Sequence, residues 1–400
     1  MTLTLLLDLD ETLLENQMGG FLEAYFSGLG QYVRSAIDPD ILLPALLSAT
    51  QKMVANRRPD RMLQEVFDET FFPILKQSRA ELQGLFDSFY TEIFPTFKDL
   101  TRAKPEAVEM VEEAIERGYR VGIATNPLFP RTAILQRLSW AGLPAQDYPF
   151  ALIPSYESFH FSKPNPAFFI EFLANIGQPD EPVLMVGDDF SNDIVAAHQA
   201  GIATFWVDDR GRTNGDAKEV TARGKITDLI PWLDSTPTES LKPDYSSQSA
   251  VIANLSGVAA AFDTLGRNLP DPYWTKKPNP NEWCLAEIMC HLRDVEAEVN
   301  LPRLQKVISE INPFIPGKDT DPWANERQYI LQDCLEARDS FIASRIELLS
   351  ILHNLELDKW QRPARHAILG PTHIQELAGI IASHDRLHIQ QAHQVIKTLS

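Results

Sequence analysis

Two carboxylates lie one residue apart near the start of the chain, directly after an apolar run. The run Leu3–Leu7 is followed by Asp8 and Asp10. Such a run is typical of a buried strand in a parallel sheet, and alternate residues of a strand point the same way. We therefore expect both carboxylates at the strand end, where open α/β sheets bind ligands. Because neighbouring carboxylates repel each other unless a cation or proton lies between them, the pair indicates a divalent metal site, or an acid and a base.

Three other segments carry polar residues at or near the ends of predicted strands. One strand ends in a hydroxyl, a loop before a helix holds a lysine, and another strand ends in an acidic loop. With the first pair they offer a nucleophile, a proton shuttle, a hydroxyl, a cation and a metal-binding acid, a set that suits phosphoryl transfer. The residues are Thr125 and Asn126, then Lys163, then Asp188, Asp189 and Asp193.

The reaction expected of this set is hydrolysis of a phosphate monoester. Mg²⁺, held by hard oxygen ligands, and a lysine would neutralise the phosphate charge that repels an anionic nucleophile. One carboxylate could then attack phosphorus and form an aspartyl-phosphate. The second would protonate the leaving oxygen and later take a proton from the hydrolytic water.

In order, these segments resemble the four motifs of the haloacid dehalogenase-like (HAD) superfamily, across residues 1 to about 233. The resemblance implies that Asp8 is the nucleophile and Asp10 the general acid/base, and that both bind Mg²⁺, Asp10 through its backbone. An acid at position 10 favours a phosphatase or phosphomutase over a dehalogenase. The other implied roles are Thr125 as phosphate-binding hydroxyl with Asn126 as a further binding residue, Lys163 as motif lysine, Asp188 as side-chain metal ligand, and Asp193 as a second acid that orients Lys163 or a water on the metal.

The acidic doublet leaves two candidates for the side-chain metal ligand. We favour Asp188 over Asp189 because it directly follows Gly187. Asp193, taken alone, is equally well explained as the cap of a helix or turn.

Five short apolar runs, most of them separated by helical patterns, predict a Rossmann-like, doubly wound parallel sheet of the α/β class. Residues 15–98 interrupt this alternation with a segment rich in leucine, phenylalanine and helix formers. Inserted directly after the first carboxylates, such a helical cap would lie over the site. The predicted catalytic core is therefore residues 1–14 and 99–233. The five runs are Leu3–Leu7, Arg120–Ala124, Phe150–Ile153, Val183–Val186 and Ala203–Val207.

The last third of the chain has a different pattern. Residues 234–249 are polar and contain prolines, which is typical of a linker. Long amphipathic patterns follow and predict an all-α four-helix bundle over residues 250–400. The predicted helices are roughly 247–267, 281–310, 328–353 and 372–398.

Three histidines of this bundle form a candidate second metal site. His384 and His388 are four residues apart and share one helix face, and His291 on another helix could be the third ligand. Three histidines with open positions would bind Zn²⁺, Ni²⁺ or Fe²⁺. The segment resembles the DinB-like (DinB/YfiT) four-helix family in Trp283, in a histidine eight residues later, and in the His-x3-His pair. That family includes metal-dependent members, some of them thiol transferases.

Several functions remain open at this stage. The first is a phosphatase fused to a metal-binding bundle. In the second, the main chemistry is a metal-dependent (thiol) transfer in the bundle. A phosphomutase would use the same two acids, and the bundle could also be a non-catalytic docking or homodimerisation module.

The amino-acid composition limits the kinds of molecule that this protein is expected to bind. A formal net charge of −19 over 400 residues argues against nucleic acid and against an anionic membrane surface. The N-terminal apolar run is short and reaches Asp8 after a few residues, so we expect it to be neither a signal peptide nor a membrane span. Three cysteines without a CxxC motif indicate reduced core residues of a cytoplasmic protein. They are Cys284, Cys290 and Cys334.

The expected substrate is a small phosphorylated metabolite. The densest basic cluster in the cap could contact such an anion or could form a solvated helix face. It consists of Lys52, Arg57, Arg58 and Arg61.

Overall fold

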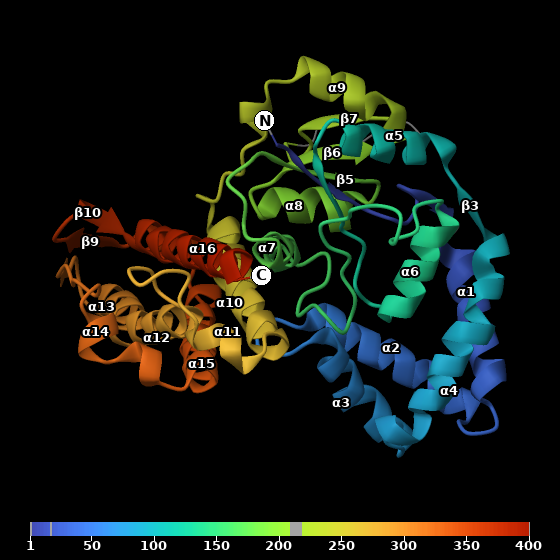
Figure 1. Ribbon diagram of the computed structural model, residues 1–400, viewed down its shortest axis with the longest axis horizontal. Helices are drawn as coiled ribbons and strands as arrows, with labels where there is room; N and C mark the ends of the chain where they lie inside the picture. Colours follow the sequence, from blue (N-terminus) through green and yellow to red (C-terminus); the bar gives the residue numbers. More distant parts are fainter. Residues whose placement is uncertain (1, 17, 209–217, 400) are drawn as a thin grey trace. The chain divides into compact units, whose positions relative to one another are not determined.

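The chain folds into two compact units in the computed structural model, which describes residues 2–16, 18–208 and 218–399 (Figure 1). The second unit gathers the C-terminal helices together with two short pieces of the N-terminal half. The longer piece is Phe169–Pro179, which the sequence pattern does not separate from its neighbours. The first unit comprises the chain up to Arg57, Arg61–Phe168 and Asp180–Pro243, and the second comprises Arg58–Asp60, Phe169–Pro179 and the chain from Asp244 onward.

A five-stranded parallel sheet forms the centre of the first unit (Figure 1). Its strand order is β4-β1-β5-β6-β7. Strand β1 (Thr4–Leu7) lies between β4 (Arg120–Ile123) and β5 (Val183–Gly187), and all its residues are buried. Beyond β5 follow β6 (Ala203–Val207) and β7 (Ala222–Gly224). The predicted α/β class with a parallel sheet is confirmed. A central strand covered on both faces explains why the first apolar run does not alternate.

The edges of this sheet differ from the prediction. Residues 150–153 lie beside β4 and form two backbone hydrogen bonds with it, of 2.8 and 3.0 Å, but they do not form a strand. Pro149 and Pro154 flank this run and carry no amide hydrogen, so the pairing cannot extend. Strand β7, in contrast, has the sequence Ala-Arg-Gly, which carries no strand signal. Its pairing with β6 is what makes it a strand.

A helical insert, called the cap below, follows the first strand. The chain leaves the sheet through β2 (Leu14–Asn16) and returns through β3 (Thr101–Ala103), and these two strands pair with each other in antiparallel fashion. The cap helices are α1 (Met18–Val33), α2 (Pro39–Ala55), α3 (Leu63–Leu75), α4 (Arg79–Glu92) and a 3-10 helix at Phe94–Leu100.

Hydrogen bonds attach the cap to a core loop, residues 156–160. The amides of Leu63 and Gln64, at the start of α3, each donate to a carbonyl oxygen of this loop at 2.8 Å. The side chain of Asn56 donates to another, also at 2.8 Å. The other helices after the cap are α5 (Pro105–Glu116), α6 (Arg131–Trp140), α7 (Ala167–Asn175, mostly in the second unit), α8 (Ala196–Gln199) and α9 (Leu229–Ser235).

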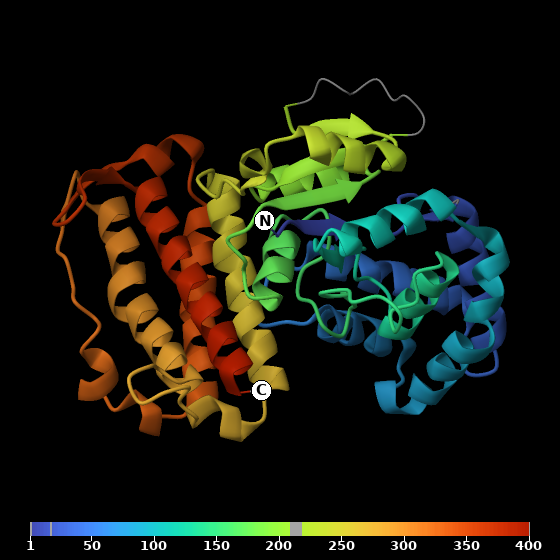
Figure 2. The ribbon, with the colours of Figure 1, turned by 45° about the horizontal axis from the view of Figure 1, so that its top comes forward.

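Four long helices run side by side in the second unit, as predicted (Figure 2). The predicted helix 281–310 is shorter at its start and is interrupted by a π-helical segment, η5 (Glu296–Asn300), before α13 (Leu301–Ser309). A small sheet in the order β10-β9-β8 was not expected. The long helices are α10 (Gln248–Asn268), α12 (Leu285–Val295), α15 (Cys334–His353) and α16 (Ile374–Leu399); the smaller elements are α11 (Asp271–Thr275), β8 (Phe314–Ile315), α14 (Trp323–Glu326), β9 (Pro363–His366) and β10 (Gly370–His373).

Helix α10 is the one described helix whose length and hydropathy would suffice to cross a membrane. Most of its apolar window is buried inside the protein, where it packs against α15 and α16. Its apolar character is therefore accounted for by the core of the bundle.

A buried arginine lies among these helices between two carboxylates. Arg345 of α15 donates through Nε to Glu296 and through Nη1 to Asp385, at 2.6 Å each. Its Nη1 also donates to the carbonyl oxygen of Leu255 at 3.0 Å. The three charged side chains are at most 1% exposed. This network ties α15 to the π-helical segment and to α16.

Candidate functional site

A buried lysine joins two carboxylates at the carboxyl edge of the parallel sheet. Asp8 directly follows β1, and Asp193 lies in the π-helical segment η2 (Phe190–Val195), shortly after β5. The Lys163 Nζ donates to Asp8 Oδ1 at 2.7 Å and to Asp193 Oδ1 at 2.6 Å. None of the three is more than 6% exposed. Charged groups this deeply buried are stable only when they are paired.

A third carboxylate completes a group that could hold a cation. One oxygen atom from each of Asp8, Asp188 and Asp193 lies within 4.8 Å of the others. We call these three residues the carboxylate group. Oxygen ligands of this kind suit Mg²⁺. Because three carboxyl groups converge here beside a single lysine, the residues present fit a divalent cation.

The neighbouring acid Asp189 has a different task. It is exposed, and its side chain accepts the amides of Ser191 and Asn192, both at 2.9 Å. It thereby caps the segment η2. Of the two candidates in the doublet, the structure brings Asp188 to the carboxylate group and places Asp189 at the N-terminus of η2.

The absence of a side chain at Gly187 allows Asp193 to reach this position. A Cβ atom there would overlap the carboxylate of Asp193, so only glycine permits the close approach. Burial and the adjacent Asp8 raise the pKa of Asp193 to about 8. Burial alone would lower the pKa of Lys163, but the two carboxylates outweigh it and raise that pKa. The lysine is therefore positively charged at neutral pH.

Asp10 has other partners. Its side chain forms an ion pair with Arg137 of α6 and accepts a hydrogen bond from Asn16 Nδ2 at 3.0 Å. Arg137 is buried and lies 5.6 Å from the ring centroids of both Phe21 and Phe129. Burial lowers the pKa of Arg137 to about 10, which still leaves it charged at neutral pH. Sequence reasoning missed Arg137, because nothing local distinguishes it from a solvated helical arginine.

The predicted hydroxyl and amide lie at the same edge of the sheet. Leu7 of β1 pairs with Ile123 of β4, so Thr125 emerges beside the first carboxylates. Thr125 is buried, and Asn126 Nδ2 donates to the carbonyl oxygen of Lys163 at 3.3 Å. All four predicted segments thus meet at one edge.

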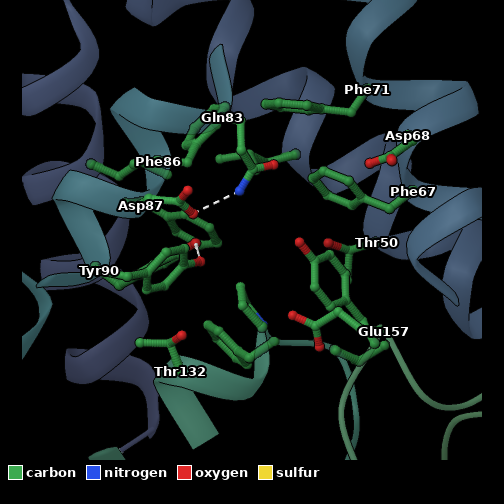
Figure 3. A pocket seen from close by; sticks show the side chains of 18 of the residues that line it. Thr50, Phe67, Asp68, Phe71, Gln83, Phe86, Asp87, Tyr90, Thr132 and Glu157 are labelled. Atoms are coloured by element: carbon green, nitrogen blue, oxygen red, sulfur yellow. Dashed lines mark hydrogen bonds between the residues drawn. The ribbon is translucent and has the colours of Figure 1, made fainter. Parts of the chain in front are cut away.

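A cavity of about 520 Å³ lies between this edge and the cap (Figure 3). Asp10, Asn126 and Arg137 contribute to its lining from the core. Nine of the described residues that line it are aromatic, and most of these belong to the cap. The cap therefore offers space for the part of a substrate that lies beyond the carboxylates.

The basic cluster predicted in the cap does not contribute to that lining among the described residues. Arg58 forms an ion pair with Asp60 at 2.6 Å, and Arg61 forms one with Glu69. Arg57 donates to two backbone carbonyl oxygens nearby, and Lys52 is exposed. The reading of this cluster as a solvated surface agrees better with these contacts than substrate binding does.

The three histidines of the second unit come together. The Nε2 atom of His384 lies 3.2 Å from the Nε2 atoms of both His291 and His388. Gln391 Oε1 accepts a hydrogen bond of 3.0 Å from His388 Nδ1, which leaves His388 Nε2 as an unprotonated ligand atom. Burial, with the neighbouring imidazoles, lowers the pKa of His291 to about 3 and that of His388 to about 4. Neutral, converging imidazoles fit a divalent transition metal.

Trp283 and the cysteines complete the description of the predicted residues. Trp283 lies just before α12, and its ring is parallel to that of His388, with centroids 6.1 Å apart. The three cysteines are free, and Cys284 and Cys290 are buried.

Both halves of the chain match known families. Residues 2–201 match the family model of haloacid dehalogenase-like hydrolases, and residues 254–392 match that of the DinB superfamily. Both predicted resemblances are therefore confirmed.

Curated relatives match part of the chain. Pyrimidine 5'-nucleotidase YjjG of Escherichia coli (strain K12) is 39% identical over 105 residues, which is 26% of this chain and 44% of that protein. Phosphoglycolate phosphatase of Vibrio vulnificus (strain CMCP6) is 32% identical over 127 residues, which is 32% of this chain and 52% of that protein. The chain spans about half the length of the curated relatives it matches.

Solved structures resemble each half separately. A HAD phosphatase from Thermococcus onnurineus is 20% identical with a TM-score of 0.39, covering 58% of this chain and 98% of that one. YfiT from Bacillus subtilis, described as a probable metal-dependent hydrolase with an unusual four-helix bundle topology, is 16% identical with a TM-score of 0.36, covering 41% of this chain and 93% of that one.

The first family match covers half of the chain and includes Lys163 and every member of the carboxylate group. The chain therefore belongs to the haloacid dehalogenase-like hydrolase family.

Proposed function

We propose that this protein is a Mg²⁺-dependent phosphatase that hydrolyses a small phosphate monoester through an aspartyl-phosphate on Asp8. The observation that carries this proposal is the buried contact of Lys163 with Asp8 and Asp193 beside Asp188. The arrangement holds a carboxylate nucleophile next to a fixed cation and to ligands for a divalent metal. The phosphatase and nucleotidase names of the relatives support the same reaction class.

The residues divide the reaction between them. Asp8 attacks phosphorus and displaces the alcohol, which forms the aspartyl-phosphate. Asp10 protonates the departing oxygen and then takes a proton from the water that attacks the aspartyl-phosphate. Arg137 and Asn16 hold the carboxyl group of Asp10 in place.

Charge stabilisation comes from the residues around the nucleophile. Lys163 fixes Asp8 and offsets negative charge that develops on the phosphoryl group. Thr125 and Asn126 offer hydrogen-bond donors at the same sheet edge. When bound to the carboxylate group, Mg²⁺ supplies positive charge opposite the phosphate oxygens.

Removing divalent cations is expected to lower hydrolysis of p-nitrophenyl phosphate by on the order of 10²-fold or more, because several kcal/mol of charge stabilisation are lost. The measurement is phosphate release after treatment with EDTA, followed by titration with Mg²⁺. Adding Mg²⁺ restores activity, and Asp188→Asn raises the Mg²⁺ concentration that is needed. Full turnover by protein shown to contain no metal would exclude the proposed role of the carboxylate group.

A second proposal concerns the bundle, where His291, His384 and His388 hold a transition metal. It is supported by three ring nitrogens that converge within hydrogen-bonding distance and by the accepting Gln391 behind His388. With three protein ligands and open positions, such a metal could bind water or a thiol.

The full-length protein purified without chelators is expected to carry about one equivalent of Zn²⁺, Ni²⁺ or Fe²⁺ at this site. Elemental analysis measures it. His384→Ala removes this metal, since it deletes the ligand that lies between the other two. The matched control is His353→Ala, because His353 is exposed on α15 and outside the cluster. Equal metal content in all three proteins would argue for a docking module with incidental histidines.

A further inference from the structure

The cavity between the cap and the core has a lining that restricts the substrate further. We propose that it accepts the leaving alcohol of a phosphate monoester that carries one planar, hydrogen-bonding aromatic ring and no second anionic group. A nucleobase and a pyridine-type ring share this chemistry. The proposal rests on the proposed function, because it assumes that the phosphate binds at the carboxylate group.

The walls of the cavity are aromatic and already packed against one another. Phe67 and Phe71 have ring centroids 4.7 Å apart, and Phe71 contacts Phe86 at 5.8 Å. Figure 3 shows Phe67 on one side of the open centre, with Phe86 and Tyr90 across from it. Aromatic rings gain from offset or edge-on contact with another ring beyond the gain from apolar burial. A planar ring between these walls would make such contacts on several sides.

Polar groups are interspersed among the rings. The hydroxyls of Tyr25 and Tyr90 are 2.8 Å apart, so one donates to the other and one hydrogen remains for a ligand. Burial raises the pKa of Tyr25 to about 12, so this phenol is protonated at neutral pH. Gln83 Nε2 donates to Asp87 at 2.6 Å, and both line the cavity. A purely aliphatic chain could not use the donor and acceptor positions that these pairs leave over, whereas the edge of a heteroaromatic ring can form hydrogen bonds with them.

The charges of the lining disfavour a second anionic group. Four acidic residues and two arginines line the cavity among the described residues. Both arginines are paired, Arg79 with Asp68 at 2.6 Å and Arg137 with Asp10. A carboxylate or second phosphate on the leaving alcohol would therefore lie near acids without an unpaired cation. The remaining acids are Asp87 and Glu157, which can accept hydrogen bonds from amino groups of a ring.

The volume of the cavity also favours a leaving alcohol that carries a ring. The cavity, about 520 Å³, falls within the range of about 300–1,000 Å³ that is typical of pockets for drug-sized ligands. A two-carbon acid would occupy little of it and would leave the rings facing water.

The test compares phosphate release by the full-length protein with Mg²⁺ from four esters. Two carry a ring, uridine 5'-monophosphate and pyridoxal 5'-phosphate, and two do not, phosphoglycolate and hexyl phosphate. We expect kcat/KM for one ring ester or both to exceed that of the other two by about 10²-fold. The two ring esters distinguish a nucleobase from a pyridine-type ring.

A variant connects the preference to the cavity. Phe86→Leu keeps apolar volume but removes a ring, and we expect it to lower kcat/KM for the preferred ring ester by about 10-fold and that for hexyl phosphate by a clearly smaller factor. Phe150→Leu, outside the cavity lining, is the matched control. Preferred hydrolysis of phosphoglycolate or hexyl phosphate would overturn this inference and leave the proposed phosphatase function standing. Absence of phosphate release from all four esters and from p-nitrophenyl phosphate would overturn both.

Discussion

Replacing Asp8 with asparagine is expected to lower phosphatase turnover by on the order of 10⁴-fold or more. An amide nitrogen or oxygen does not attack phosphorus as a carboxylate does, so the aspartyl-phosphate cannot form. The amide oxygen can still accept the hydrogen bond of Lys163, which keeps the change local. Hydrolysis of p-nitrophenyl phosphate with saturating Mg²⁺ measures the loss. In the unchanged protein, mass spectrometry of rapidly quenched turnover should find the phosphoryl group on the peptide that contains Asp8.

The matched control is Asp189→Asn. Asn caps a helix as well as Asp does, and Asp189 lies outside the carboxylate group. This variant should hydrolyse the substrate at nearly the rate of the unchanged protein. If Asp8→Asn retained activity, another nucleophile would be needed, and if Asp189→Asn lost it equally, the distinction between the two acids of the doublet would be wrong.

The largest effect on stability is expected from Arg345→Met. The substitution leaves Glu296 and Asp385 buried without their cation, and breaking a buried ion pair in this way costs about 3–5 kcal/mol. Hydrogen exchange of the full-length protein, read on the amides of α10, α12, α15 and α16, localises the loss to the second unit. Denaturant unfolding gives its size.

Two further variants make this result specific. Arg365→Met removes an exposed arginine of β9 and should change the free energy of unfolding by about 0.5 kcal/mol or less. Adding Glu296→Gln and Asp385→Asn to Arg345→Met should recover part of the loss, because the uncompensated charges are then gone. Unchanged exchange rates in Arg345→Met would mean that the network contributes no net stability.

The sequence was sufficient to predict which residues lie at the carboxyl edge of the sheet. Asp8, Thr125 and Asp188 each follow an apolar run, and parallel strands bring all their carboxyl ends to one edge. Lys163 has no such run directly before it; the sequence placed it only in a loop before a helix, and its role came from the family resemblance. The i, i+4 spacing of His384 and His388 was likewise enough to put both on one face, whereas the approach of His291 depends on how α12 packs against α16.

The cavity could not be predicted, because its lining comes from helices that are distant in sequence. Phe67, Phe86 and Phe129 lie on different elements, and the angles at which these elements pack are not encoded in any one segment. Arg137 was missed for a related reason. A helical arginine is usually solvated, and only the tertiary contact with Asp10 shows that it is buried. Similarly, β7 is a strand because it pairs with β6, since its own residues do not favour a strand.

The antiparallel ribbon of β2 and β3 has a mechanical consequence. It contains the only two places where the described chain passes between sheet and cap. Any swing that admits a bulky ester must therefore pivot about Leu14–Asn16 and Thr101–Ala103. The same swing must also break the hydrogen bonds that Asn56, Leu63 and Gln64 form with residues 156–160. Movement of the cap away from the core would thus bend this ribbon and separate residues 56–64 from residues 156–160 in one step.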